Sequence, residues 1–382
     1  MSPARTVRNT LAPLVLLAVA TALAAAATDA DLDARAIALN KKLLNVDTHA
    51  DVLIPATPER YWAPGHTSRT DVAKLDKGSV DVVALAIAVG PGPRTPAATA
   101  EARAEADLKL ETIRRFVKEN SSRVAIALTA ADITRIHQQG KIAIIESFQN
   151  TRSIGKDVGA IDAFYKAGVR IFALTHAGNN DFADSSRPQE GEGEEHHGLS
   201  PLGKQAITKL NQLGVIVDVS QLTPAGVFQV LQITKAPVLA THSNVRTLID
   251  NTRNLSDKEL DAIKANGGVV SVTPFNPYLV TAPAGFDPKS GAQPPKATLS
   301  AYVDHLDYLV KRIGVDHVGI GTDFNHGSGI TGFDDESEAP NVTRELLRRG
   351  YTEEQIAKIW GGNFLRVFRQ VEAVALKTQQ KS

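Results

Sequence analysis

The sequence predicts an α/β protein whose parallel strands close into a (β/α)8 TIM-like barrel. Eight short β-branched or apolar runs recur along the chain, and longer amphipathic segments lie between most of them. Side chains that can ligate metals or transfer protons stand at the carboxyl ends of several runs, where a barrel builds its active face. A doubly wound open sheet stays the alternative, because strand counts from pattern alone can err by one or two.

The predicted strands follow one another at regular intervals, at 44–51, 80–89, 141–148, 169–176, 215–220, 237–242, 268–274 and 317–323. The clearest helical segments between or after them are 101–119, 203–213, 299–313 and 352–373. Ser256 and Thr352 are each followed three residues later by Glu or Gln, which is the pattern of a capping box at a helix N-terminus.

Three segments interrupt this alternation. The first two are loops at 61–77 and 181–198, and the third is a stretch at 278–298 that is rich in Pro, Gly and Ala. The second loop contains the acidic run 190–195, which we interpret either as solvated surface or as part of a flap near the site.

The N-terminus has the pattern of a secretory signal peptide. Arg5 and Arg8 precede an uncharged stretch at 11–27 that is rich in Leu, Val and Ala and ends in small residues. We therefore expect a signal peptide at 1–27, a single barrel domain at 28–382, and export to the periplasm or outside the cell. The stretch is somewhat short for a membrane span of about 20 residues, so an uncleaved anchor is the weaker alternative and the mature chain should have no span.

Composition excludes several function classes. The chain has 382 residues, 42 basic and 42 acidic side chains and no cysteine. A net charge near zero argues against binding to a phosphate backbone, so no nucleic-acid partner is expected. Without cysteine there is no disulfide framework, thiolate zinc site or cysteine nucleophile, so His, Asp, Glu or other oxygen donors must hold any metal.

The carboxyl ends of the predicted strands carry candidate metal ligands. His49 and Asp51 end the first run, and the period of two along a strand directs both to one side. Further candidates end later runs, namely Glu146, His176, His242 and Asp323. A buried His or carboxylate needs a partner, and a divalent cation supplies one. Each residue alone is weak evidence, because a lone His is more often hydrogen-bonded in the core and a lone Glu146 could pair with an Arg.

Longer motifs accompany these residues. They are Leu-Thr-His with Asn and Ala-Asp in 174–185, the pair 198–203 and 210–214, Thr241-His242-Ser243, Thr252-Arg253-Asn254, and the stretches 321–324 and 345–350. Together with His49-x-Asp51, they resemble the renal or membrane dipeptidase family, which are zinc metallopeptidases with an amidohydrolase-like barrel of the metal-dependent hydrolase type. The resemblance covers about 45–372.

The resemblance implies a zinc site with one position intact and a second one altered. The first ion would be bound by His49, Asp51 and Glu146, with Glu146 matching the bridging glutamate of the family. The second would be bound by Glu146, His242 and Gln221, where the family typically has a histidine. Because a neutral amide is a far poorer zinc ligand than imidazole, occupancy of the second site stays open.

The resemblance also implies an activity, the hydrolysis of short dipeptides, including those with a D-residue at the carboxyl side, by a metal-activated water. Asp323 would transfer the proton and His176 would bind the substrate and stabilise the oxyanion. Arg253 would pair with the substrate carboxylate, and Asn325 is a further expected substrate contact. The small dipeptide is the expected partner, and the family is consistent with a homodimer. Two alternatives remain: a hydrolase of another amide or ester, such as N-acyl amino acids, and a non-catalytic member, for which Gln221 is the argument.

Overall fold

A computed structural model describes residues 29–281 and 295–380. The predicted signal peptide lies outside these residues, as does much of the excursion at 278–298. In the part that is described, no helix has the length and apolar character needed to cross a membrane.

Eight parallel strands form the barrel in sequence order, each paired with the next. They are β1 (Val46–Asp51), β2 (Val82–Ala88), β4 (Ile142–Gln149), β5 (Val169–Ala173), β6 (Ile216–Asp218), β7 (Leu239–Ala240), β8 (Val269–Val272) and β9 (Val318–Ile320). All eight predicted strands are confirmed. A short extra strand that the sequence reading missed, β3 (Val124–Ile126), pairs with the start of β4.

The barrel closes where β1 meets the chain that follows β9. The amide of Asp51 donates to the carbonyl of Phe324 at 2.8 Å, and the amide of Asp323 donates to the carbonyl of His49 at 2.7 Å. Because the first and last strands are neighbours, the predicted barrel is confirmed and the open doubly wound sheet is wrong. The same backbone bonds bring the ends of β1 and β9 together, and these ends carry the first candidate ligands.

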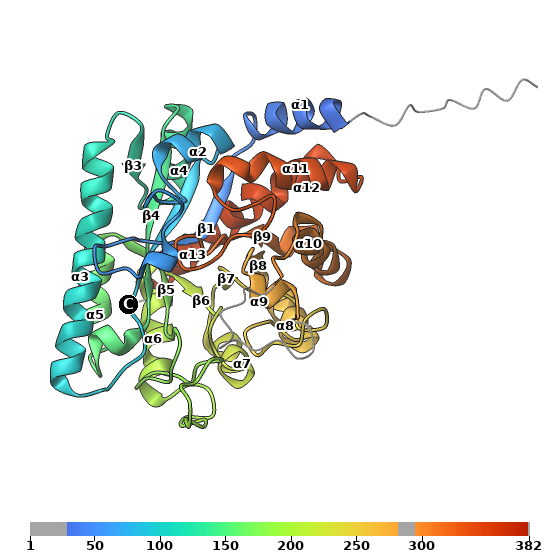
Figure 1. Cartoon of the computed structure of the whole chain (residues 1–382). Coiled ribbons are helices and arrows are strands. Elements are labelled where there is room, and N and C mark those ends of the chain that lie inside the picture. The colour runs from blue at the N-terminus through green and yellow to red at the C-terminus, as the bar shows by residue number, and fades with distance from the viewer. Residues whose placement is uncertain (1–28, 282–294, 381–382) are drawn as a thin grey trace, which may run out of the picture.

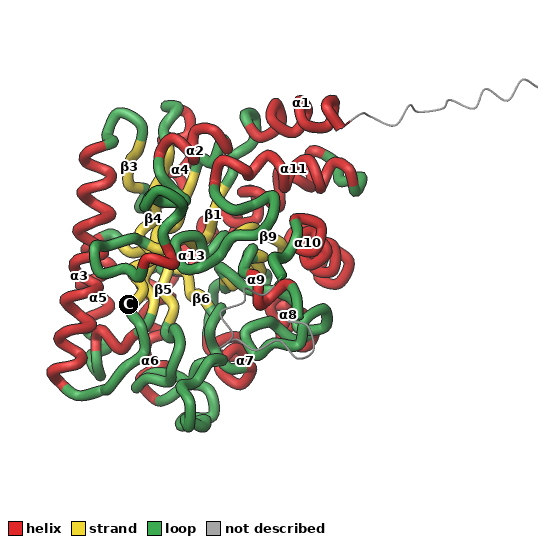
Figure 2. The backbone as a smooth tube through the Cα atoms, viewed as in Figure 1, coloured by secondary structure: helices red, strands yellow, loops and turns green. Residues whose placement is uncertain are grey.

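Helices surround the strands, as Figure 1 shows. They are α1 (Asp29–Asn40), α2 (Val72–Gly78), α3 (Pro96–Glu119), α4 (Ala130–Gln138), α5 (Ala160–Ala167), α6 (Pro201–Leu213), α7 (Pro224–Ile233), α8 (Asp257–Asn266), α9 (Asn276–Leu279), α10 (Leu299–Ile313), α11 (Ala339–Arg348), α12 (Glu353–Ala357) and α13 (Asn363–Gln379). A π-helical turn, Lys358–Gly362, joins α12 to α13. Both predicted capping boxes are present, at the starts of α8 and α12. Long loops lie between these elements, and Figure 2 distinguishes them from the helices and strands.

The buried apolar residues divide into two clusters that show which way each strand residue points. Ala143 and Ile145 of β4 pack with interior residues of other strands, such as Val46 and Ile171. Ile144 and Phe148 belong instead to the cluster between the strands and the helices, and the ring of Phe148 lies 4.6 Å from that of Phe164 in α5. Even-numbered residues of β4 therefore face the helices, and odd-numbered residues face the barrel interior.

Candidate metal centre

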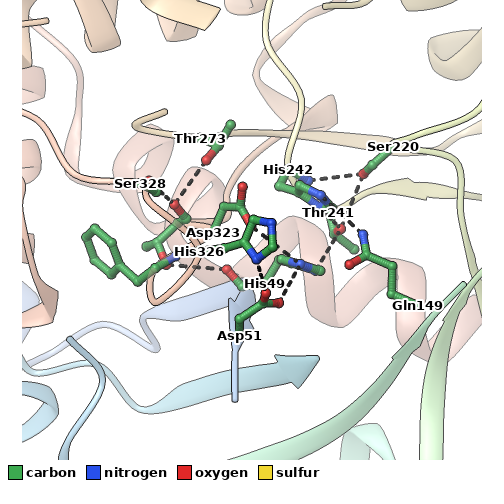
Figure 3. A network of polar contacts seen from close by, with 12 residues as sticks. His49, Asp51, Gln149, Ser220, Thr241, His242, Thr273, Asp323, His326 and Ser328 are labelled. Carbon is green, nitrogen blue, oxygen red and sulfur yellow. Dashed lines mark hydrogen bonds and ion pairs between the residues drawn. The ribbon is translucent and has the colours of Figure 1, made fainter. Parts of the chain in front are cut away.

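His49, Asp51 and Asp323 form a compact buried cluster at the carboxyl ends of β1 and β9. His49 Nε2 lies 3.7 Å from Asp51 Oδ1 and 3.8 Å from Asp323 Oδ1, and ligand atoms of the three residues lie within 4.8 Å of one another. Figure 3 shows these side chains pointing toward one another. His49 Nε2 and Asp51 Oδ1 are buried and have no hydrogen-bond partner in the described chain. Buried polar atoms rarely stay unpaired, so this donor set fits a divalent cation.

His326 contacts the cluster from the side of Asp51. Its Nδ1 lies 2.6 Å from Asp51 Oδ2, and its ring stacks on Tyr61 with a centroid distance of 4.8 Å. Burial alone would raise the pKa of Asp51, but His326 and His49 hold that pKa well below its usual range. Burial raises the pKa of Asp323, in spite of the neighbouring histidines. In the opposite direction, Asp51 and Asp323 raise the pKa values of His49 and His326 in spite of burial. The cluster is thus a set of two carboxylates and two histidines that are coupled electrostatically.

His242, at the end of β7, lies on the other side of His49. The two imidazole rings stack with a centroid distance of 3.8 Å. His242 Nε2 faces two amides, Gln221 Nε2 at 3.2 Å and Gln149 Nε2 at 3.5 Å, and Gln149 is visible beside it in Figure 3. The predicted proximity of Gln221 and His242 therefore exists, and both side chains that face His242 Nε2 are neutral amides.

Asp218 is near enough to form a second group with His49 and His242, but hydrogen bonds already occupy its carboxylate. It accepts from Thr241 Oγ1 at 2.6 Å and from Ser220 Oγ at 2.6 Å. Thr241 Oγ1 also lies 2.7 Å from His242 Nδ1. Asp218 therefore orients His242 through Thr241, and this group fits a second cation less well than the first group fits one.

Glu146 lies outside this centre, and its prediction as a bridging metal ligand is wrong. It shares the helix-facing side of β4 with Ile144 and Phe148. Its Oε1 lies 3.5 Å from Nε of Arg114 in α3. Burial raises the pKa of Glu146 to about 7, and Arg114 opposes that rise. Glu146 is therefore a buried carboxyl between barrel and helices, paired with an arginine.

Gln149 is the β4 residue that reaches the centre, and sequence reasoning missed it. It is an odd-numbered residue of the strand and lies on the interior face with Ala143 and Ile145. The predicted run ended one residue earlier, at Phe148. Counting the alternation forward from Ile145 would have identified it.

A cavity of about 750 Å³ opens beside the cluster and is lined in part by Asp51, Tyr61, His176, Arg187 and His326. His176 lines this cavity, and its expected contact with the substrate stays a prediction. Its Nδ1 is buried without a partner, and burial together with the nearby His326 holds its pKa well below the usual range. His176 is therefore neutral and can give one hydrogen bond to a ligand.

Arg253 is fully buried and does not line this cavity. Its Nη1 donates to the carbonyl of Ser220 at 2.5 Å, and its Nη2 donates to the carbonyl of His242 at 2.7 Å. Within the described chain only Nε has no partner. Few N–H groups of Arg253 are therefore free to form the expected salt bridge with a substrate carboxylate. Instead, Arg253 holds the loops after β6 and β7 in place.

Asn325 borders the cavity, but its side-chain amide is occupied by the protein. Its Nδ2 is 3.0 Å from the carbonyl of Asp51 and 3.1 Å from Ser68 Oγ, and its Oδ1 accepts from the amide of Arg69 at 2.8 Å. The expected substrate contact is therefore replaced by a positioning role, in which Asn325 ties the 68–70 loop to the end of β1.

The loop at 181–198 has one part that is exposed to solvent and another part that reaches the cavity. Its acidic run is mostly exposed, as expected of solvated surface. Asp184 accepts from the amides of His196 and Gly198, which folds the loop back on itself. Earlier in the loop, Arg187 reaches the cavity. Sequence reasoning gave Arg187 no role.

Comparison with known proteins relates the whole barrel to one family. The family model of the membrane dipeptidases, peptidase family M19, matches residues 33–382. Dipeptidase tcpJ of Claviceps purpurea is 35% identical over 268 residues, which cover 70% of this chain and 60% of that protein. Dipeptidase aclJ of Aspergillus oryzae is 32% identical over 270 residues, covering 70% and 61%.

A solved structure is similar over almost its full length. The crystal structure of the probable dipeptidase PvdM from Pseudomonas aeruginosa is 35% identical, with a TM-score of 0.83 over 90% of this chain and 99% of that one. The match to the two fungal relatives spans less than two thirds of their length. The extent of the family match nevertheless decides the classification: this chain belongs to the membrane dipeptidase family, peptidase family M19.

Proposed function

We propose that this protein is a metal-dependent dipeptidase that works with a single divalent cation, zinc, held by His49, Asp51 and Asp323. The observation that carries the proposal is the pair of buried, unpartnered ligand atoms, His49 Nε2 and Asp51 Oδ1, next to a cavity of about 750 Å³. A cation bound there would polarise the scissile carbonyl and lower the pKa of a water molecule toward about 7. Membership of the dipeptidase family supports a peptide bond as the target.

The protein side chains supply the remaining steps. The Asp323 carboxylate has two oxygens, so one could hold the cation while the other takes a proton from the attacking water and passes it to the leaving amine. Neutral His176 borders the cavity with an unpartnered ring nitrogen, so it can donate a hydrogen bond to the carbonyl oxygen as negative charge develops there.

The experiment is release of free amino acids from a panel of L-L and L-D dipeptides by the purified protein, with zinc or with a chelator. We expect hydrolysis that the chelator abolishes and that Asp323→Asn lowers about 100-fold or more. N-acyl amino acids belong in the same panel, because turnover of these compounds and none of dipeptides would favour the alternative hydrolase. A folded, zinc-binding protein without any turnover would contradict catalysis.

A specific observation favours that last, non-catalytic reading as the second candidate. Both residues facing His242 Nε2, Gln149 and Gln221, are neutral amides, so neither brings a charged ligand to that half of the centre. The panel decides between the two candidates.

We also propose export of the protein. The basic residues before the apolar stretch at 11–27 and the small residues at its end support this. Expression of the whole gene, followed by fractionation and N-terminal sequencing, tests it. A mature N-terminus near residue 28 in the exported fraction is the expected result, and full-length protein in the cytoplasm would contradict it.

A further inference from the structure

Three hydrogen bonds fix the backbone at and next to Arg187. The amide of Gly178 donates to the carbonyl of Arg187 at 2.8 Å, and the amide of Ser186 donates to the carbonyl of Gln221 at 2.9 Å. The amide of Arg187 itself donates to Ser185 Oγ at 3.1 Å. The loop after β5 is thereby attached to the loop after β6, so the Arg187 side chain starts from a fixed position.

The guanidinium of Arg187 is only partly satisfied. Its Nη2 donates to Gln221 Oε1 at 3.1 Å, whereas its Nε is buried without a partner. Lys109, the other Lys or Arg at the cavity, is paired with Glu105 at 3.0 Å. Among the residues that the structure describes, no carboxylate lies within ion-pair distance of Arg187. Arg187 is partly buried, and its Nε is a buried donor with neither a hydrogen-bond partner nor a counter-charge, so this arrangement suits a site that an anion completes.

The ligand of the proposed function contains such an anion. A dipeptide has a free carboxylate, and Arg253, which the sequence suggested for it, has both Nη atoms bonded to backbone carbonyls. A planar guanidinium with Nε–H and further N–H groups free can bind a carboxylate through two parallel hydrogen bonds. Gln221 fits beside it, because its amide oxygen accepts from Arg187 while its amide nitrogen faces His242.

We propose that Arg187 is the specificity-determining residue that binds the carboxylate of the substrate, an inference that rests on the proposed function. The residue selects ligands with a free carboxylate at the end of the cavity nearest Gln221. It also explains the amide at position 221, since a histidine there would offer the guanidinium no comparable oxygen.

The test compares carboxylate ligands with their carboxamides in the zinc-supplied protein. N-acetyl-alanine and N-acetyl-alaninamide are titrated by calorimetry, and Ala-Ala is followed by its KM with Ala-Ala amide as competitor. The wild type should prefer each carboxylate. Arg187→Ala should weaken carboxylate binding about 10- to 100-fold and leave amide binding unchanged, with a larger effect on KM than on kcat. Arg187→Lys should restore part of the preference, because charge returns without the fork.

Arg94→Ala is the matched control, since Arg94 pairs with Glu195 at the outer side of the same loop and does not line the cavity. It should keep the full preference. Retention of the preference in Arg187→Ala, or binding of no carboxylate by the wild type, would overturn the assignment. If N-acetyl-alanine binds with an Arg187-dependent preference while dipeptides are not hydrolysed, the proposed function fails and the role of Arg187 stands.

Discussion

Zinc should stabilise this protein through the cluster of His49, Asp51 and Asp323, and Glu146 should contribute nothing. A ligand that binds only the folded state at 100 times its Kd adds about 2.7 kcal/mol. For a chain of this size, 1 kcal/mol shifts the Tm by roughly 2 °C, so zinc should raise the Tm by about 5 °C over protein treated with chelator. Asp51→Asn removes a buried carboxylate with an unpartnered oxygen and should abolish most of this shift.

Glu146→Gln is the matched control. The substitution preserves shape on the helix-facing side of β4, and burial already raises the pKa of this carboxyl to about 7, so a neutral amide should be tolerated. The assay is thermal unfolding of each variant with zinc and with chelator, so the intrinsic effect of each substitution cancels within a pair. Loss of the zinc shift in Glu146→Gln, or its survival in Asp51→Asn, would refute the placement of the metal.

Three further predictions concern the surroundings of the centre. Gln149→Glu combined with Gln221→His should give His242 two ionisable partners. Bound zinc, measured by metal analysis after dialysis, should then rise from one to two equivalents. A single equivalent would contradict the idea that the two amides prevent a second zinc ion from binding beside His242. Burial and the adjacent Asp47 hold the pKa of Glu336 well above its usual range, so the folded state binds the extra proton and stability should fall as pH rises above the usual pKa of 4.5. Glu336→Gln should make that fall shallower in urea unfolding between about pH 5 and 8, while other buried carboxyls such as Glu146 keep part of it, and an unchanged pH dependence would count against it. Asn325→Ala removes the hydrogen bonds of the side-chain amide and places alanine at φ 66°. The free energy of unfolding in urea should therefore fall by about 2–4 kcal/mol. An unaltered unfolding midpoint would show that other contacts hold the 68–70 loop.

The strands of the barrel could be predicted from the sequence because each is a compact apolar run bounded by polar residues. All eight appear, including β7, which has only two strand-paired residues, Leu239 and Ala240. The missed strand β3 has three residues, Val124–Ile126, and pairs only with the start of β4. Such a short segment has too few positions for any period to be recognised.

The candidate site was predicted less completely, because strand ends fix which residues are near but not which way they face. His49 and Asp51 were placed correctly by the period of two. Glu146 failed by the same rule, since it is one residue out of step with Ile145, which faces the interior. Arg187 could not be predicted, because its position depends on hydrogen bonds between two loops separated by more than thirty residues of sequence.

The charges of the residues around His49 and His242 form a coherent set. On the His49 side, Asp51 and Asp323 bring two carboxylates that a divalent cation would neutralise. On the His242 side, the two amides bring no charge, and Arg187 is bonded to one of them, Gln221. A carboxylate at position 221 would form an ion pair with Arg187 and compete with a substrate carboxylate for it. The neutral side chain at 221 and the guanidinium without an ion-pair partner therefore fit the proposed arrangement, in which a metal would hold the reacting bond and Arg187 would hold the free carboxylate.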